Sequence, residues 1–210
     1  MRALRSVPQA LQVLIVVVLT TGVICQSIQR TDPTPVLMYF TMDSAVLATL
    51  IVAAGLAWRK MTDQTWYARI KLMATTGVVF SGLIYAAVIA PVVSPGGWSN
   101  PGDDLPVRVA TVLVHGIAPF LITAEYLLSR GPDLSLRQVG WALLWPLAFL
   151  LVTTAVLLMT EIRTPYAFLD LAAMGGPLPV VGVIFGMSAI ILVIAGTLVI
   201  ARRRYLPDRR

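Results

Sequence analysis

The sequence predicts an all-α membrane protein: a polytopic transmembrane bundle of six helices whose N-terminus and C-terminus are both cytoplasmic. Three observations support this prediction, namely the composition, the lengths of the apolar segments and the placement of the basic residues. Of the 210 residues, 58% are hydrophobic and only 12% are charged, whereas a soluble domain has about 45–50% apolar and about 25% charged residues. A soluble fold of this size has too little interior to bury so much apolar surface.

Six apolar segments reach the roughly 20 residues that a helix needs to cross a bilayer. We assign the whole chain to one transmembrane domain with spans at residues 7–29, 36–58, 68–93, 107–129, 139–160 and 179–201. The connections between these spans are charged or rich in Pro, Gly and Asn, which interrupt helices. Arg2 and Arg5 precede the first span as they would in a signal peptide, but the span is long enough to cross, so we expect an uncleaved helix.

The basic residues set the orientation, because Lys and Arg accumulate in short cytoplasmic loops. With the N-terminus inside, only Arg30, Arg108 and Arg163 of the 16 basic residues fall on the outer side. The net charge of +6 therefore reflects orientation and contact with anionic lipid. No polar stretch interleaves aromatic with basic residues, so we expect membrane lipids as partners and no nucleic acid. The predicted location is the cell membrane, with multiple passes.

The chain has one cysteine, Cys25, and one histidine, His115. These counts exclude an intramolecular disulfide, a cysteine-based metal cage, a zinc site built from several histidines and a haem held between two histidines of this chain. We therefore expect neither a metal nor a cofactor.

Ionisable side chains are costly inside a bilayer and need a physical reason to be there. Three of them lie well within the predicted spans, away from the span ends: Asp43, His115 and Glu125. Counted at the helical rise from the outer ends of their spans, Thr41, Asp43 and His115 lie about 7, 10 and 12 Å deep and share one layer. Glu125 lies about 27 Å deep by the same count. Near the inner face we expect interfacial water or an Arg to contact it.

Further polar side chains reach the outer layer. Ser81 and Tyr85 are one turn apart on the third span, and Arg108 follows the same stripe of the fourth span as His115. Together with Ser44, these side chains are candidates for substrate binding, and Ser44, Tyr85 and Arg108 are candidates for stabilising an oxyanion.

The second span carries polar groups on two nearly opposite faces. Thr41 and Ser44 share one face, and Tyr39 and Asp43 share the other. Because an Asp should not face lipid, we expect protein on both sides of this helix.

Two side chains of the outer layer suggest acyl chemistry. A threonine hydroxyl is a weak nucleophile until a base removes its proton, and a neutral histidine is a suitable base. Thr41 and His115 would then form a nucleophile–base pair for an ester of an acyl chain in the outer leaflet. The residues also fit a non-enzymatic carrier or small-molecule binding protein that uses Asp43 and His115 as a polar site. In a third reading, the chain is a structural partner of another membrane complex, and Thr41 bonds to its own backbone.

Four motifs occur in order along the second to fifth spans and the last outer loop. They are Tyr-Phe-Thr-Met-Asp-Ser at 39–44, His-Gly-Ile-Ala-Pro-Phe at 115–120, Trp-Pro-Leu-Ala-Phe at 145–149 and Thr-Pro-Tyr-Ala-Phe-Leu-Asp at 164–170. This set resembles bacterial six-helix membrane proteins related to the androgen-induced and androgen-dependent TFPI-regulating family of threonine hydrolases.

The resemblance implies an enzyme that hydrolyses fatty acid esters of hydroxy fatty acids, with Thr41 as the nucleophile and His115 as the base. Tyr166 and Asp170 of the loop motif would support the site or the substrate. One departure is Asp-Ser-Ala at 43–45, where the family has Gln-Ser-Asn. If those amides orient the substrate or the oxyanion, this chain differs in substrate or lacks the activity.

Reporter fusions test the predicted orientation. One span separates residue 63 from residue 98, so the two positions should lie in opposite compartments. We expect alkaline phosphatase to be active when fused after residue 98 and inactive after residue 63, with a cytoplasmic reporter giving the reverse pattern. Equal activity at both positions would contradict the topology.

Overall fold

The computed structural model describes residues 3–93, 97–129, 131–160 and 164–205. The protein is 82% helical, and its described residues form no strand. Six helices are long and apolar enough to cross a membrane, which confirms the predicted fold class of a multi-pass helical bundle. Arg2, Arg130, Arg163, Arg209 and Arg210, which enter the charge count, lie outside the described residues.

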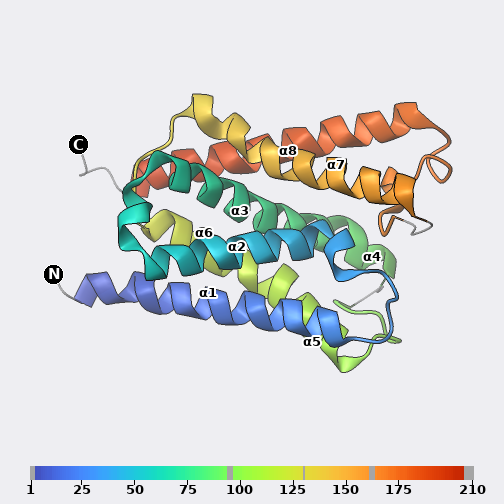
Figure 1. The fold of residues 1–210 in the computed structure, drawn as a ribbon, viewed down its shortest axis with the longest axis horizontal. Coiled ribbons are helices and arrows are strands. Elements are labelled where there is room, and N and C mark those ends of the chain that lie inside the picture. The colour runs from blue at the N-terminus through green and yellow to red at the C-terminus, as the bar shows by residue number, and fades with distance from the viewer. Residues whose placement is uncertain (1–2, 94–96, 130, 161–163, 206–210) are drawn as a thin grey trace.

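Each span is formed by one helix or by consecutive helical segments (Figure 1). They are α1 (Ala3–Ile28); α2 (Phe40–Ala57); α3 (Thr65–Ile84) with η3 (Tyr85–Ile89) and α4 (Ala90–Val93); α5 (Leu105–Thr111) with η4 (Val112–Ile117) and α6 (Ala118–Leu128); η5 (Leu136–Leu143) with α7 (Leu144–Met159); and α8 (Pro177–Tyr205). The segments η3 and η4 are π-helical, and η5 is a 3₁₀ helix. Short 3₁₀ turns, η1 (Val36–Met38), η2 (Arg59–Asp63) and η6 (Ala167–Leu169), lie in the connections.

The start of α1 and the end of α8 lie at the same end of the bundle, as an even number of spans requires (Figure 1). The six apolar spans agree with the predicted ranges to within four residues. The cytoplasmic assignment of that end stays a prediction.

The second span begins later than predicted. The expected start at residue 36 is wrong, because η1 is followed by Tyr39 in an extended conformation (φ −99°, ψ 117°) and α2 begins at Phe40. The Tyr39 hydroxyl donates a hydrogen bond to the Asp32 carboxylate, which holds this extended entry. Thr41 is therefore the second residue of α2 and lies at the end of the bundle opposite the two chain ends, which is the predicted outer end.

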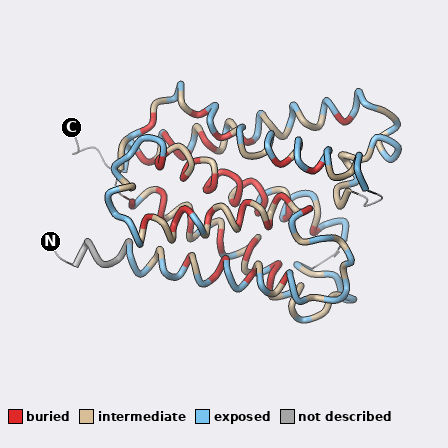
Figure 2. Tube along the Cα trace, viewed as in Figure 1, coloured by how far each residue is buried: buried red, intermediate tan, exposed pale blue. Residues whose placement is uncertain are grey.

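The helix α3 is the centre of the bundle and packs against α2, α6, α7 and α8. In the most apolar stretch of the span that contains α3, 50% of the residues are buried. The corresponding share in the span that contains α7 is 17%. Ala74 and Val78 of α3 enter one core cluster with α1, α2 and α6, while Leu72 and Phe80 enter a second with α7 and α8. Figure 2 shows this buried layer running through the middle helices.

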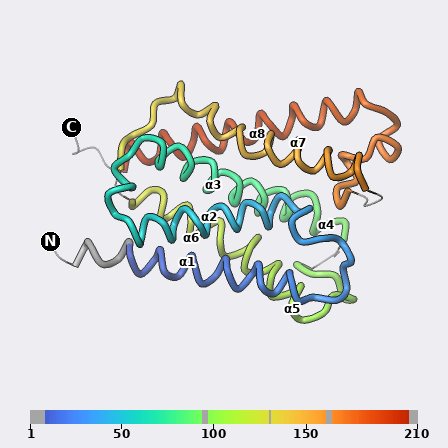
Figure 3. Tube along the Cα trace, viewed as in Figure 1, coloured from blue at the N-terminus to red at the C-terminus, as the bar shows by residue number. Residues whose placement is uncertain are grey.

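Small residues allow the close helix contacts that membrane bundles need, since lipid provides no hydrophobic force between helices. Gly77 of α3 lies against Ser44, and a Cβ at Gly77 would lie 2.7 Å from the Ser44 hydroxyl. The last two spans pack differently: α7 and α8 both contact α3 but scarcely contact each other. Figure 3 shows them together on the side of the bundle opposite α1.

A polar cluster ties three helices together in the half of the bundle that contains both chain ends. Glu125 of α6 is fully buried, and its Oε1 accepts hydrogen bonds from Lys71 Nζ of α3 at 2.6 Å and from Gln12 Nε2 of α1 at 2.7 Å. The expectation that Glu125 meets interfacial water or an Arg is therefore wrong. The helices α1, α3 and α6 surround the carboxylate, and Lys71 of the preceding span neutralises its charge.

Arg202, near the end of α8, has a structural role. Arg202 is 3% exposed and pairs with Asp133 at 3.7 Å. One of its terminal nitrogens donates to the carbonyls of Ser129 and Gly131 at 3.3 and 3.1 Å. Arg202 thus fastens the end of α8 to the connection that follows α6.

Breaking one side of the Lys71–Glu125 pair should be more harmful than removing both partners. Lys71→Met or Glu125→Leu leaves a buried group without its partner, which costs about 3–5 kcal/mol. The double variant Lys71→Met/Glu125→Leu should recover much of this loss. Thermal unfolding in detergent measures the effect, with Lys60→Met, at an exposed position, as the control. A double variant as unstable as the sum of the single variants would contradict the pairing argument.

Candidate functional site

Thr41 and His115 meet between α2 and η4. The His115 Nε2 atom lies 3.3 Å from the Thr41 Oγ1 atom, although 74 residues separate them in the sequence. This is the contact that the depth argument predicted. It forms even though α2 starts four residues later than expected.

The imidazole is placed by irregular helix geometry. His115 lies in the π-helical segment η4, and Pro119 follows one turn later at the start of α6. Proline has no N–H to bond to the His115 carbonyl, so the regular helix is interrupted here. Short π-helical insertions of this kind occur often at functional sites.

The second ring nitrogen of His115 is directed along its own helix. Nδ1 is buried and has no hydrogen-bond partner among the described residues. When the proton of the neutral ring is on Nδ1, Nε2 is an acceptor and can take the Thr41 hydroxyl proton.

Tyr85 supports the imidazole from its other side. The rings of Tyr85 and His115 stack with centroids 4.0 Å apart and planes 19° apart. Tyr85 also stacks on Trp98, and its hydroxyl donates to the Trp98 carbonyl at 2.6 Å. Tyr85 lies in the second π-helical segment, η3, so it holds the base through ring stacking while its hydroxyl is bonded to the outer loop.

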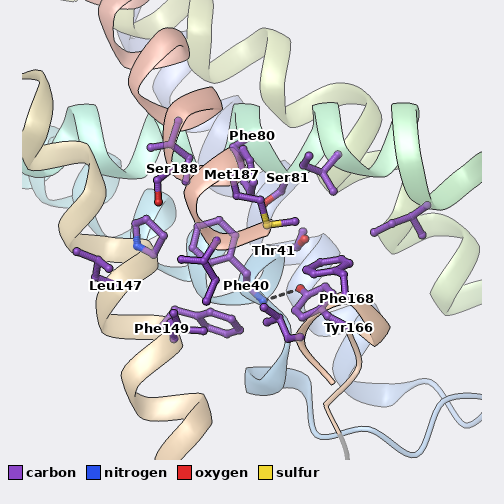
Figure 4. Close-up of a pocket in the computed structure, with 17 residues that line it drawn as sticks. Phe40, Thr41, Phe80, Ser81, Leu147, Phe149, Tyr166, Phe168, Met187 and Ser188 are labelled. Atoms are coloured by element: carbon purple, nitrogen blue, oxygen red, sulfur yellow. Dashed lines mark hydrogen bonds between the residues drawn. The ribbon is translucent and has the colours of Figure 1, made fainter. Parts of the chain in front are cut away.

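The hydroxyl of Thr41 lies at the wall of an apolar cavity of about 740 Å³, counting the space at its open side. In Figure 4, Thr41, Tyr166 and Phe168 lie at one end of the cavity, and Leu147 and Ser188 lie at the other. The lining comes from α2, α3, η3, α7, α8 and the loop around η6. Its polar members are the hydroxyls of Thr41, Ser81, Tyr166 and Ser188.

Tyr166 of the last outer loop caps α2 at the site. The Phe40 N–H donates to the Tyr166 hydroxyl oxygen at 2.9 Å, and Thr41, the next residue, lines the same cavity as Tyr166. The Tyr166 ring stacks on Phe168 with centroids 5.1 Å apart. Burial raises the pKa of Tyr166 well above its usual range, and the nearby Asp43 carboxylate adds to this. The phenol therefore stays neutral and keeps its proton.

Two other predicted residues lie near the pair without contacting it. Ser44 is fully buried, and its hydroxyl accepts a hydrogen bond from Trp145 Nε1 at 3.2 Å, so it joins α2 to α7. Ser81 lines the cavity, but its hydroxyl donates to the Gly77 carbonyl at 2.8 Å.

Arg108 and Asp170 serve the outer loops. The Arg108 guanidinium donates to the carbonyls of Pro101 and Asp103 at 2.7 and 2.9 Å and is exposed. The Asp170 carboxylate accepts from two backbone N–H groups of the turn at 172–173. The structure brings neither side chain to Thr41.

Asp43 lies on another side of α2. It is two residues from Thr41, a rotation of about 200° around the helix. Its stripe continues through Leu47 to Leu50, which is 62% exposed, and Asp43 itself is half-buried. Leu47 packs against the core cluster of α1, α2, α3 and α6, so protein covers this stripe of α2 only in part. Asp43 and His115 do not face one cavity.

The sequence did not reveal several parts of the site. Ser188 and Met187 of α8 line the cavity, and Trp98 supports Tyr85, but single residues in apolar or loop segments carry no chemical signal. Pro119 lies directly after η4, at the start of α6. Among the described residues, no group of three or more His, Cys, Asp or Glu side chains could hold a metal ion.

Gly82 of α3 permits the close approach that positions His115. A Cβ at this position would lie 2.6 Å from Pro119 Cγ and 2.9 Å from the His115 carbonyl oxygen. We expect Gly82→Ala to push η4 away and lower stability by about 1–3 kcal/mol. Gly186→Ala on α8 is the control, because a Cβ there meets nothing within 4 Å. Thermal unfolding of both variants measures the difference, and equal melting temperatures would contradict the role of Gly82.

No protein-family model, curated protein or solved structure matches this chain. The resemblance to threonine hydrolases therefore stays a prediction based on the four motifs, and the case for a function depends on the geometry of the site.

Proposed function

We propose that this membrane protein is an intramembrane lipid-ester hydrolase in which Thr41 is the nucleophile and His115 is the general base. The single observation that carries the proposal is the 3.3 Å contact between Thr41 Oγ1 and His115 Nε2 at the wall of an apolar cavity. A nucleophile–base pair without a bound substrate is often slightly longer than an ideal hydrogen bond.

The reaction proceeds in two halves. His115 Nε2 takes the proton of the Thr41 hydroxyl as Oγ1 attacks the ester carbonyl carbon. The tetrahedral intermediate collapses to an acyl–threonine, and His115 returns the proton to the departing alkoxide. His115 then removes a proton from water, which attacks the acyl–threonine, and the collapsing intermediate releases the fatty acid and restores the Thr41 hydroxyl. One ester and one water give one acid and one alcohol.

The cavity favours a substrate with a long acyl chain. Its lining is almost entirely apolar and runs from Thr41 along α7 and α8 towards the middle of the bundle. Because α7 and α8 scarcely contact each other, a chain can enter from the bilayer between them. Fatty acid esters of hydroxy fatty acids, the class that the resemblance implies, satisfy these requirements.

The carrier alternative receives less support from the same geometry. It requires Asp43 and His115 to face a shared cavity with a route to both membrane sides. The two side chains lie on different sides of α2, and Asp43 does not line the cavity. Thr41, in contrast, contacts both the imidazole and the cavity.

Substitution of either member of the pair should abolish hydrolysis. We expect Thr41→Ala and His115→Ala each to lower kcat/KM for a lipid ester by a factor on the order of 10³ or more, and the double variant to lose little beyond that. The measurement is fatty acid release by purified protein, together with labelling by a fluorophosphonate probe.

Thr49→Ala is the matched control, since the Thr49 hydroxyl belongs to the same helix but donates to the Ala45 carbonyl at 2.8 Å. It should retain activity and labelling. Equal labelling of the unsubstituted protein and Thr41→Ala would rule out Thr41 as the nucleophile.

A further inference from the structure

A hydrolase of this kind needs a hydrogen-bond donor for the negative charge that develops on the ester carbonyl oxygen. Backbone N–H groups at a helix N-terminus often supply it. Here the first turn of α2 carries the nucleophile itself, but its first N–H, from Phe40, already donates to the Tyr166 hydroxyl oxygen at 2.9 Å. The phenol of Tyr166 thus stands between the helix N-terminus and the cavity.

We propose that Tyr166 is the oxyanion donor of this site. This inference rests on the proposed hydrolase function and deepens it by assigning a third catalytic residue. Tyr166 and Thr41 line the same cavity, and the Tyr166 hydroxyl is bonded to Phe40, the residue that precedes Thr41, so a carbonyl attacked by Thr41 Oγ1 comes to rest near it.

The hydrogen-bonding capacity of the phenol supports this role. Its oxygen accepts from the backbone at the start of α2, so its own O–H remains as a donor. During the attack, this O–H donates to the carbonyl oxygen of the ester. Donation from the Phe40 N–H polarises the phenol, because hydrogen bonds in a chain strengthen one another. The positive end of α2 thereby acts on the substrate through Tyr166.

The loop that carries Tyr166 is built to hold it. Its ring meets Phe149 of α7 and Tyr39 at the entry of α2 edge to face, with centroids 6.4 and 6.3 Å apart. Phe168 stacks on its other side. Removal of the hydroxyl alone leaves these aromatic contacts, so Tyr166→Phe isolates the donor.

The test combines this variant with a change in the substrate. A thionoester carries sulfur in place of the carbonyl oxygen and is a poor hydrogen-bond acceptor. We expect Tyr166→Phe to lower kcat for the oxygen ester about 100-fold with little change in KM. For the matched thionoester, kcat should change only a few-fold, because the protein cannot lose a bond that sulfur does not make.

Tyr67→Phe is the control, because it removes a buried tyrosine hydroxyl that donates to the Ile51 carbonyl at 2.9 Å, towards the other end of α2. It should affect both substrates equally and only slightly. An equal loss on both substrates for Tyr166→Phe would show that Tyr166 acts only through the structure of α2, and unchanged activity would also overturn the proposal.

The two proposals fail in different ways. Activity that survives Thr41→Ala refutes the proposed function and this inference with it. Activity that requires Thr41 and His115 but shows no substrate-dependent effect of Tyr166→Phe refutes this inference alone.

Discussion

The absence of water inside a bilayer is the constraint on which this structure depends. Every polar group in the hydrocarbon region must find its partner within the chain, because lipid offers neither donors nor acceptors. The polar side chains accordingly gather in two layers. One contains Gln12, Lys71 and Glu125, and the other contains Thr41 and His115 with their supporting residues. Between the two layers, the central helix α3 contributes apolar core side chains and the buried residues Thr75 and Thr76.

The sequence predicted the fold well because span length and charge bias arise from that same constraint. It also predicted the contact between Thr41 and His115, since depth along a helix can be counted from the end of a span. The lateral direction of a side chain was harder to predict. Asp43 lies on a partly covered stripe of α2, and Glu125 pairs with Lys71, because those outcomes depend on which helices become neighbours.

Irregular helix geometry explains most of the other differences between the predicted and the observed positions of the site residues. The extended conformation of Tyr39 delays the start of α2, and Tyr166, from a loop 126 residues away in the sequence, caps that start. The π-helical segments η3 and η4 turn Tyr85 and His115 towards each other. Periodicity arguments assume a regular helix, so they cannot place side chains within such segments.

The two polar layers have different roles: one fixes the packing of the helices, and the other contains the residues proposed to react. The Lys71–Glu125 pair is short, fully buried and held by α1, α3 and α6, so it fixes the relative positions of three helices. The Thr41–His115 contact is longer, lies beside a cavity and is assembled from irregular segments and an outer loop. A reactive pair must exchange protons with a substrate and therefore cannot be as tightly satisfied as a structural pair. The rigid layer allows the outer end of the bundle to keep a loosely bonded hydroxyl and an open cavity.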